Sequence, residues 1–180
     1  MRISFNIAIL TVLAGCVENP VTVDQETPPL LFTSFESSGL PSLEDWYTSR
    51  STMDTNAILF NEGSPGGGSW SARVFGVPLS TQAIFRDVKL NQSDSLTKYI
   101  ISFWAKGNGA ATIQLSSSAT KMLQFGPIRS FDEPNWTHFS DTLVSHSTQF
   151  DTLSVLLSRG IFDSIAVAQF DEVLVIRNLP

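Results

Sequence analysis

The sequence has one cysteine and two histidines in 180 residues, and both scarcities restrict what the protein can be. A single cysteine cannot form an intramolecular disulfide, so we expect the fold to depend on its hydrophobic core. His138 and His146 have no partner residue at the spacing of metal ligands, so we expect no zinc site. Long helical patterns are missing too, because no window above about ten residues keeps a helical apolar period.

Complete catalytic motifs are also missing. The segment Gly67-Gly68-Ser69-Trp70-Ser71 departs from a nucleophile elbow at its last position, where that motif has glycine. The same loop lacks the lysine and the following helix of a phosphate-binding loop. Counting acids does not exclude hydrolysis by paired carboxylates, since Asp132, Glu133, Asp141, Asp151 and Asp163 are present. We predict a protein that is not an enzyme.

The N-terminus has the pattern of an export signal. Met1 and Arg2 precede an apolar run that ends near Leu13, which is too short for a membrane-spanning anchor. The segment Leu13-Ala14-Gly15-Cys16 resembles the lipobox of bacterial lipoproteins, in which the cysteine is acylated and becomes the mature N-terminus. The resemblance implies removal of residues 1–15 and a lipid anchor on Cys16. The alternative is an ordinary signal peptide with a chance cysteine.

The predicted mature chain is acidic and tethered. Without residues 1–15 it keeps ten basic and 17 acidic side chains, a net charge of −7. This charge argues against binding to nucleic acid and against attachment to anionic lipid through a cluster of basic residues. Residues 16–29 are rich in proline and acids, as expected of an extended linker. Lipid attachment would place the protein in the cell envelope, and Val17 is compatible with sorting to the outer membrane, by resemblance to other lipoproteins.

Residues 30–180 fit one domain by length, and their pattern is that of β-strands. The clearest strand is Thr152 to Ser158, in which Leu153, Val155 and Leu157 alternate with polar residues and Leu156 is the one exception. Other predicted strands are Leu30–Phe35, Ala57–Phe60, Trp70–Phe75, Ala83–Leu90, Tyr99–Trp104, Ala111–Ser116, Lys121–Phe125, Trp136–Leu143 and Ala166–Arg177. Tyr99–Trp104 is apolar on both sides, which predicts a central strand. Gly107-Asn108-Gly109 predicts a tight hairpin. The sequence therefore predicts an all-β antiparallel sandwich or barrel.

Several segments, taken in order, resemble the jelly-roll carbohydrate-binding modules of families four, nine and twenty-two, within the galactose-binding-like group of sandwiches. They are Ser34-Phe35-Glu36 with Trp46, Gly66-Gly67-Gly68-Ser69 leading into Ser71-Ala72-Arg73-Val74, Tyr99 to Gly107, Trp136 with Phe139, and Phe170-Asp171-Glu172-Val173. The likeness covers about Leu30 to Arg177 and implies a jelly-roll antiparallel β-sandwich that binds carbohydrate without catalysis.

The resemblance also implies a structural calcium ion. In such modules the acid after the first strand and the acid of the last strand lie together and help to hold the ion. The corresponding residues are Glu36 and Asp171. Calcium prefers six to eight oxygen ligands, which carboxylates and loop carbonyls can supply. The alternative is a pair of solvated acids at strand ends.

Sugar-binding modules stack sugar rings on exposed aromatic side chains and orient them with a few polar groups. Trp136 is the candidate for an exposed ring, because it shares a strand face with His138 and other polar residues. Tyr47 is a candidate for a rim aromatic, Gln114 for a polar partner, and Trp46 for a further aromatic with a mainly structural role.

The sequence leaves two functions open. The first is a membrane-tethered module that binds poly- or oligosaccharide. The second is a structural lipoprotein that uses the faces of the sandwich to contact an envelope protein. Exposed aromatics along a groove favour the first, and closed polar faces or an aliphatic patch favour the second.

Overall fold

The computed structural model describes residues 28–48, 58–75, 83–91, 97–160 and 166–178. Within these ranges the regular structure consists of strands, and every paired strand is antiparallel to its neighbour, which confirms the predicted fold class. No helix that could cross a membrane occurs in these ranges. The predicted signal peptide, Cys16 and nearly all of the linker lie outside the described residues.

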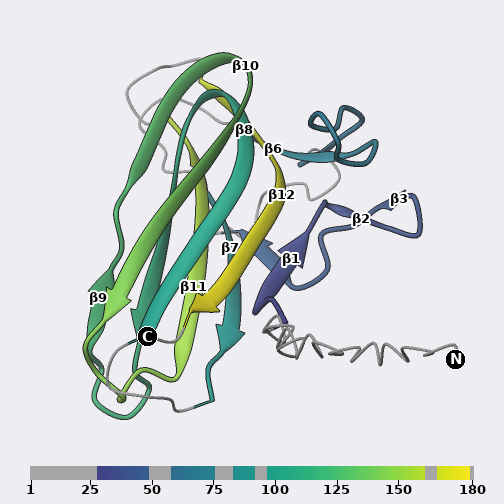
Figure 1. The fold of residues 1–180 in the computed structure, drawn as a ribbon. Coiled ribbons are helices and arrows are strands. Elements are labelled where there is room, and N and C mark those ends of the chain that lie inside the picture. Colours follow the sequence, from purple (N-terminus) through teal and green to yellow (C-terminus); the bar gives the residue numbers. More distant parts are fainter. Residues whose placement is uncertain (1–27, 49–57, 76–82, 92–96, 161–165, 179–180) are drawn as a thin grey trace, which may run out of the picture.

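The first half of the chain contributes short strands: β1 (Leu31–Thr33), β2 (Glu36–Ser37), β3 (Leu40–Pro41), β4 (Trp46–Thr48), β5 (Leu59–Phe60), β6 (Ser71–Phe75) and β7 (Ala83–Lys89). The second half contributes β8 (Thr97–Ser116), β9 (Leu123–Phe125), β10 (Arg129–Ser145), β11 (Thr152–Arg159) and β12 (Val167–Asn178). Figure 1 shows the long strands side by side, with the small β2–β3 hairpin projecting from the body.

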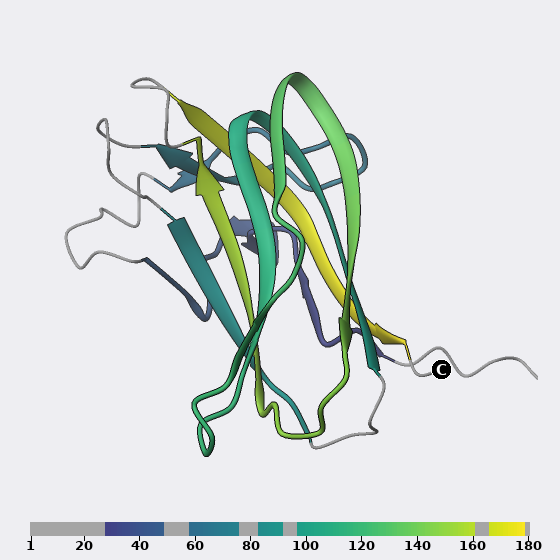
Figure 2. The same cartoon turned by 90° about the vertical axis from the view of Figure 1, so that its left-hand side faces the viewer.

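Ten of the strands form one sheet that folds into two layers (Figures 1 and 2). In the first layer the N-terminal half of β8 pairs with β10 and β12, and β12 continues the layer to β6 and β1. In the second layer the C-terminal half of β8 pairs with β11 and β9, and β11 continues the layer through β7 to β4. Because β8 and β10 pass through both layers, the two layers are joined at a corner.

The predicted hairpin at Gly107-Asn108-Gly109 is wrong, because these residues lie inside β8 where the strand changes layers. Gly107 has a φ of +84°, and Gly109 lies against Ala168 and Phe131. Two glycines therefore allow one strand to bend and to approach β12 closely. Two glycines close together are typical of a turn. Here the neighbouring strands continue past them, so β8 bends at a corner and does not reverse.

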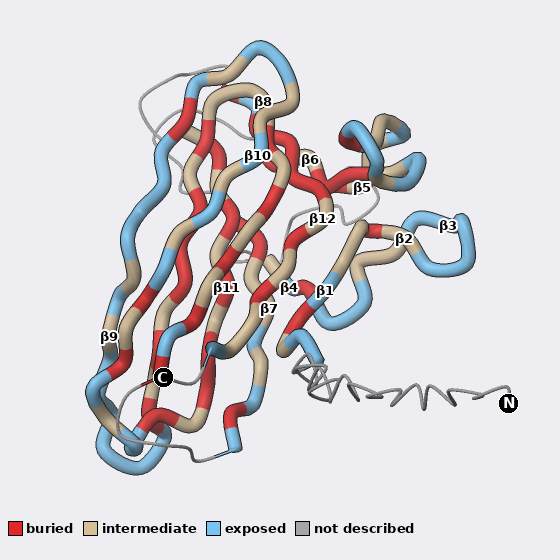
Figure 3. Tube along the Cα trace, in the orientation of Figure 1, coloured by how far each residue is buried: buried red, intermediate tan, exposed pale blue. Residues whose placement is uncertain are grey.

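Side chains alternate between the core and the two outer faces. In β8 the side chains of Tyr99, Ile101 and Phe103 are buried and those between them are half-buried, and β8 has partners on both sides, as expected of a central strand (Figure 3). In β11 Leu153, Val155 and Leu157 are buried as predicted. Four phenylalanine rings meet near the corner, with centroids 5.5 to 6.1 Å apart: Phe103, Phe131, Phe139 and Phe170.

Candidate ligand-binding groove

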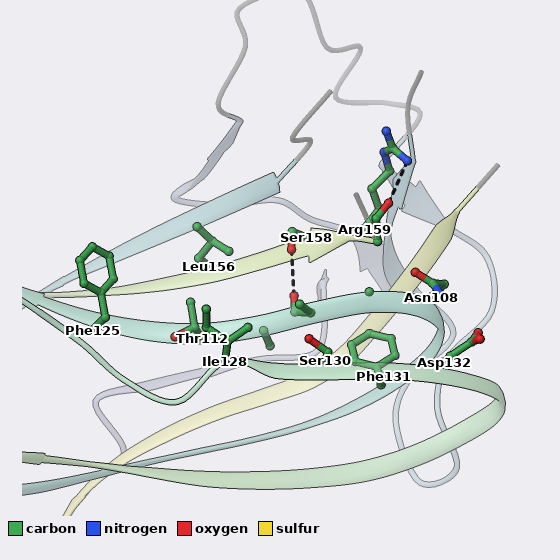
Figure 4. Close-up of a pocket in the computed structure, with 14 residues that line it drawn as sticks. Asn108, Thr112, Phe125, Ile128, Ser130, Phe131, Asp132, Leu156, Ser158 and Arg159 are labelled. Atoms are coloured by element: carbon green, nitrogen blue, oxygen red, sulfur yellow. Dashed lines mark hydrogen bonds between the residues drawn. The ribbon is translucent and has the colours of Figure 1, made fainter. Parts of the chain in front are cut away.

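An open hollow of about 890 Å³ lies on the outer face of the second layer, and we call it the outer groove (Figure 4). Its floor is the segment Asn108 to Thr112 of β8. Leu156, Ser158, Arg159 and Gly160 line it from the β11 side, and Phe125, Ile128, Ser130, Phe131 and Asp132 line it from the side of β9 and β10. The outer groove is therefore a depression in the outer face of the second layer that is open to solvent.

The hollow exists because small side chains meet in one row across three strands. Ala110 of β8 pairs with Ser158 of β11 on one side and with Ser130 of β10 on the other. Directly paired residues project from the same face of a sheet, so these three positions leave space where larger side chains would fill it. In the next row Leu156 pairs with Thr112 and forms one wall of the hollow.

The centre of the outer groove is apolar. Phe125 is 65% exposed and Ile128 is 71% exposed, which is unusual for side chains of this size. The Ser158 hydroxyl donates to the Ala110 carbonyl oxygen at 3.2 Å, and the Thr112 hydroxyl donates to the Ile113 carbonyl oxygen at 3.3 Å. Because both hydroxyls already have backbone partners, the floor presents mainly methyl groups and carbon surface to a ligand.

Two residues predicted from the sequence lie on the same outer face beside the groove. Tyr47 of β4 is 49% exposed, and its ring stacks on Phe85 at 5.5 Å. Phe85 in turn pairs with Leu156 in the groove wall. Gln114 pairs with Ser154 on one side and with Phe125 on the other. The face that carries the outer groove therefore also carries the Tyr47–Phe85 aromatic pair and the Gln114 amide.

The Asp87 carboxylate connects two strands of this face through hydrogen bonds. Asp87 accepts a hydrogen bond from the Tyr47 hydroxyl at 3.1 Å and one from the Ser154 hydroxyl at 2.6 Å. Partial burial and the neighbouring Asp87 carboxylate raise the pKa of the Tyr47 phenol. The phenol thus stays protonated and fixed in place, as a rim aromatic should be.

The other two aromatic candidates do not line the outer groove, and Trp46 has the mainly structural role that the sequence predicted. Trp46 is only 8% exposed and packs on Phe35 in the core, so its ring is not available for stacking on a ligand. Trp136 is half-buried, and the Lys106 ammonium lies 5.3 Å from the centre of its ring. It also lies on β10 near the bulge opposite Lys106, whereas Gln114 lies eight residues further along β8, beyond the corner and on the second layer. Trp136 and Gln114 therefore do not share a site.

Sequence reasoning missed Leu156, Phe125 and Ile128 as groove residues. The signal for Leu156 was its break in the alternation of β11, which places a leucine on the outer face. Phe125 and Ile128 flank a Gly-Pro turn, where no strand period predicts exposure. Their role depends on where that turn lies relative to β8 and β11.

The structure brings Glu36 and Asp171 to one place beneath the glycine-rich loop, residues 63–69. Asp171 is fully buried and accepts hydrogen bonds from the backbone N–H groups of Ser64 at 2.7 Å and Glu172 at 2.8 Å. Glu36 accepts one from the Ser69 N–H at 2.9 Å. Burial, with a smaller contribution from the charge of Glu36, raises the pKa of the Asp171 carboxyl. A side chain on Gly67 or Gly68 would overlap one of these carboxylates, so the loop fits closely over both.

This acidic pair has the chemistry of a site for a hard divalent cation. Neither carboxylate forms an ion pair with a described lysine or arginine. The buried Ser64 hydroxyl lies beside Asp171 and acts to lower the pKa of its carboxyl, against the larger effect of burial. Two carboxylates, this hydroxyl and loop carbonyls are oxygen donors of the type that calcium prefers. No group of three or more Asp, Glu, His or Cys side chains suited to a metal occurs in the described ranges, so backbone oxygens would have to complete a coordination shell.

Fold and groove together define a jelly-roll β-sandwich domain with an open groove on the outer face of one layer. No protein-family model matches the sequence, and no curated protein matches it. Solved structures with the same fold do exist. One is the Clostridium thermocellum xylanase 10B fragment that joins a CBM22-1 module to a GH10 module, in complex with xylohexaose. It has a TM-score of 0.58 and 13% identity, and the match covers 83% of this chain and 28% of that one.

Two further structures extend the comparison. The CBM22-2 xylan-binding domain of Paenibacillus barcinonensis Xyn10C has a TM-score of 0.56 and 14% identity, over 83% of this chain and 99% of that domain. The enzymatically active domain of tailspike protein 4 from bacteriophage CBA120 has a TM-score of 0.53 and 12% identity, over 74% of this chain and 19% of that one. At these identities the similarity shows a shared fold, and function has to be inferred from the site.

Proposed function

We propose that this domain binds a polysaccharide in the outer groove and performs no chemistry on it. The observation that carries the proposal is an open groove on a sheet face, lined by the exposed ring of Phe125 and continued by the Tyr47–Phe85 stack. Sugar rings have apolar C–H faces that stack on aromatic rings, and the volume of the hollow lies in the usual range for small-ligand sites. The similarity in fold to xylan-binding domains supports a glycan as the ligand.

Replacing Phe125 by alanine is expected to weaken polysaccharide binding at least tenfold, because it removes the most exposed aromatic ring of the groove. Since the ring lies mostly in solvent, unfolding free energy should change by about 0.5 kcal/mol or less. Affinity electrophoresis and calorimetry of the purified protein with soluble xylan and glucan would measure the effect. The matched control is Phe32→Ala, which removes a ring that is 59% exposed on the first layer. Equal losses in both variants would refute the groove as the site.

A protein partner is the second candidate function, and one surface favours it. Outside the groove, Met122 and Leu123 at the start of β9 are exposed aliphatic side chains, which sugar binding alone does not require. If the protein binds none of the polysaccharides while alterations of these side chains release it from an envelope complex, the second function is the better account.

We also propose that the protein is an envelope lipoprotein anchored through Cys16, as its N-terminal sequence suggests. Replacing Cys16 by serine should abolish incorporation of labelled fatty acid and leave an unprocessed precursor, because no other thiol exists to accept the lipid. Metabolic labelling followed by membrane fractionation of wild-type and variant cells measures both. Unchanged labelling of the variant would contradict the proposed anchor.

We propose further that Glu36 and Asp171 hold a structural calcium ion. The support is the pairing of two carboxylates, one fully buried, without a cationic side chain beside them. Bound there, the ion would supply the positive charge that the described residues do not, and it would connect the segment after β1 to β12.

A further inference from the structure

We infer that the outer groove selects uncharged glycans that carry acetyl substituents, and that it binds them more tightly than the same glycans without acetyl groups. This inference rests on the proposed polysaccharide binding and specifies which feature of the glycan the site recognises. Three properties of the groove lead to it: the shape of its centre, its supply of hydrogen bonds, and its charge.

The shape of the centre suits a small apolar branch. The row Ser158, Ala110 and Ser130 leaves a depression, and the side chains of Leu156 and Ile128 rise beside it (Figure 4). A methyl group that projects from a sugar ring stacked on Phe125 can enter this depression and displace water from carbon surface.

Hydrogen bonding at the centre disfavours bare sugar hydroxyls. The hydroxyls of Ser158 and Thr112 both donate to backbone carbonyls. A ligand hydroxyl placed over Leu156 and the Ala110 methyl group would lose its hydrogen bonds to water without a replacement. An acetyl methyl group has no hydrogen bond to lose there.

Donors for the carbonyl oxygen of an acetyl group border the apolar centre of the hollow. The Ser130 hydroxyl, in the same row as Ala110, and the Asn108 amide both line the hollow. An acetyl group with its methyl towards Ala110 therefore has potential donors in reach on the same floor. This arrangement accommodates both ends of the substituent.

Charge excludes the acidic sugars. Asp132 lines the groove, and Asp87 lies on the same face. Arg159 is the cation among the described lining residues, but it is only 1% exposed and donates to the Gly160 carbonyl. Among the lining residues of the hollow, uronates and sulfated sugars would therefore meet the Asp132 carboxylate without an accessible positive partner.

The test compares two neutral polysaccharides in matched forms: acetylated glucomannan and chemically acetylated linear xylan, each against the same polymer after saponification. Calorimetry of the purified protein is expected to show at least tenfold tighter binding of the acetylated form, which corresponds to about 1.4 kcal/mol. Equal binding of both forms would overturn the acetyl inference and leave polysaccharide binding intact. Binding of neither form would overturn the proposed function and the inference with it.

Two variants test whether the hollow causes the preference for acetylated polymer. Ala110→Leu, which fills the depression from its floor, should remove the preference for acetylated polymer. Ile128→Ser should reduce it without affecting folding, because Ile128 is 71% exposed. The matched control is Ser102→Leu, a half-buried serine on the same strand but on the outer face of the first layer, where it pairs with Ser140 and Leu174. A preference that survives both groove variants, or that Ser102→Leu removes as well, would contradict the inference.

Discussion

Replacing Gly107 by alanine is expected to lower the free energy of unfolding by about 4 kcal/mol or more, a large part of the total stability of a typical domain. Gly107 has a φ of +84°, which costs an L-residue roughly 1–2 kcal/mol. The larger penalty is steric, because the new Cβ would overlap the Val167 carbonyl oxygen of β12. That oxygen belongs to the backbone of a paired strand, so no side-chain rotation can relieve the overlap.

Gly39→Ala is the matched control for this prediction. Gly39 has a similar φ of +77° in the β2–β3 turn, but an added Cβ would meet nothing within 4 Å. The Gly39→Ala variant should therefore lose only about 1 kcal/mol of unfolding free energy, which is the cost of the backbone conformation. Urea unfolding of the two variants measures both costs. Similar losses would show that the corner of β8 tolerates a side chain.

Calcium at about 2 mM is expected to raise the free energy of unfolding by roughly 3–4 kcal/mol if the site binds with a dissociation constant of a few micromolar. The reason is that the ion binds the folded chain, where Glu36 and Asp171 lie together, and not the unfolded one, where 135 positions separate them. Thermal melts with calcium and with chelator measure the gain. Glu36→Gln should abolish it, whereas Glu44→Gln, at an exposed acid nearby, should not.

The calcium effect should depend on pH with a definite sign. Burial raises the pKa of Asp171 in the folded chain, so without metal its contribution to stability is fully present below the unfolded value of about 3.9. That contribution is lost as the pH rises through the folded pKa. Calcium requires the ionised carboxylate, so the gain in melting temperature should grow as the pH rises from about 3.9 through the raised pKa of Asp171. A constant gain over this range would argue that Asp171 is not a ligand.

Local sequence pattern was sufficient for the buried faces of β8 and β11 and for the class of fold. In β11 the alternation of Leu153, Val155 and Leu157 identified the buried face, because successive side chains of a strand point to opposite sides. The apolar segment that begins at Tyr99 identified a central strand in the same way. These features depend on neighbours within a few residues, which the sequence displays directly.

The candidate site was only partly predictable. Tyr47 and Gln114 were selected as polar or aromatic residues on outward positions, and the structure places both on the face of the outer groove. Trp136 was selected by the same reasoning, yet its ring is half-buried with Lys106 near it, whereas Trp46 is buried as its predicted structural role requires. A strand period identifies a face, but it does not reveal what packs over that face from elsewhere in the chain.

The sequence by itself determined that the chain is acidic, nearly free of cysteine, patterned as antiparallel strands and equipped with a lipobox-like N-terminus. Only the tertiary structure decided that Gly107 makes a corner and that Ser158, Ala110 and Ser130 form the floor of a hollow. The reason is register: those three residues are spread over 48 positions, and pairing between distant strands aligns them. A shift of one residue in either pairing would replace the depression with side chains from the core face.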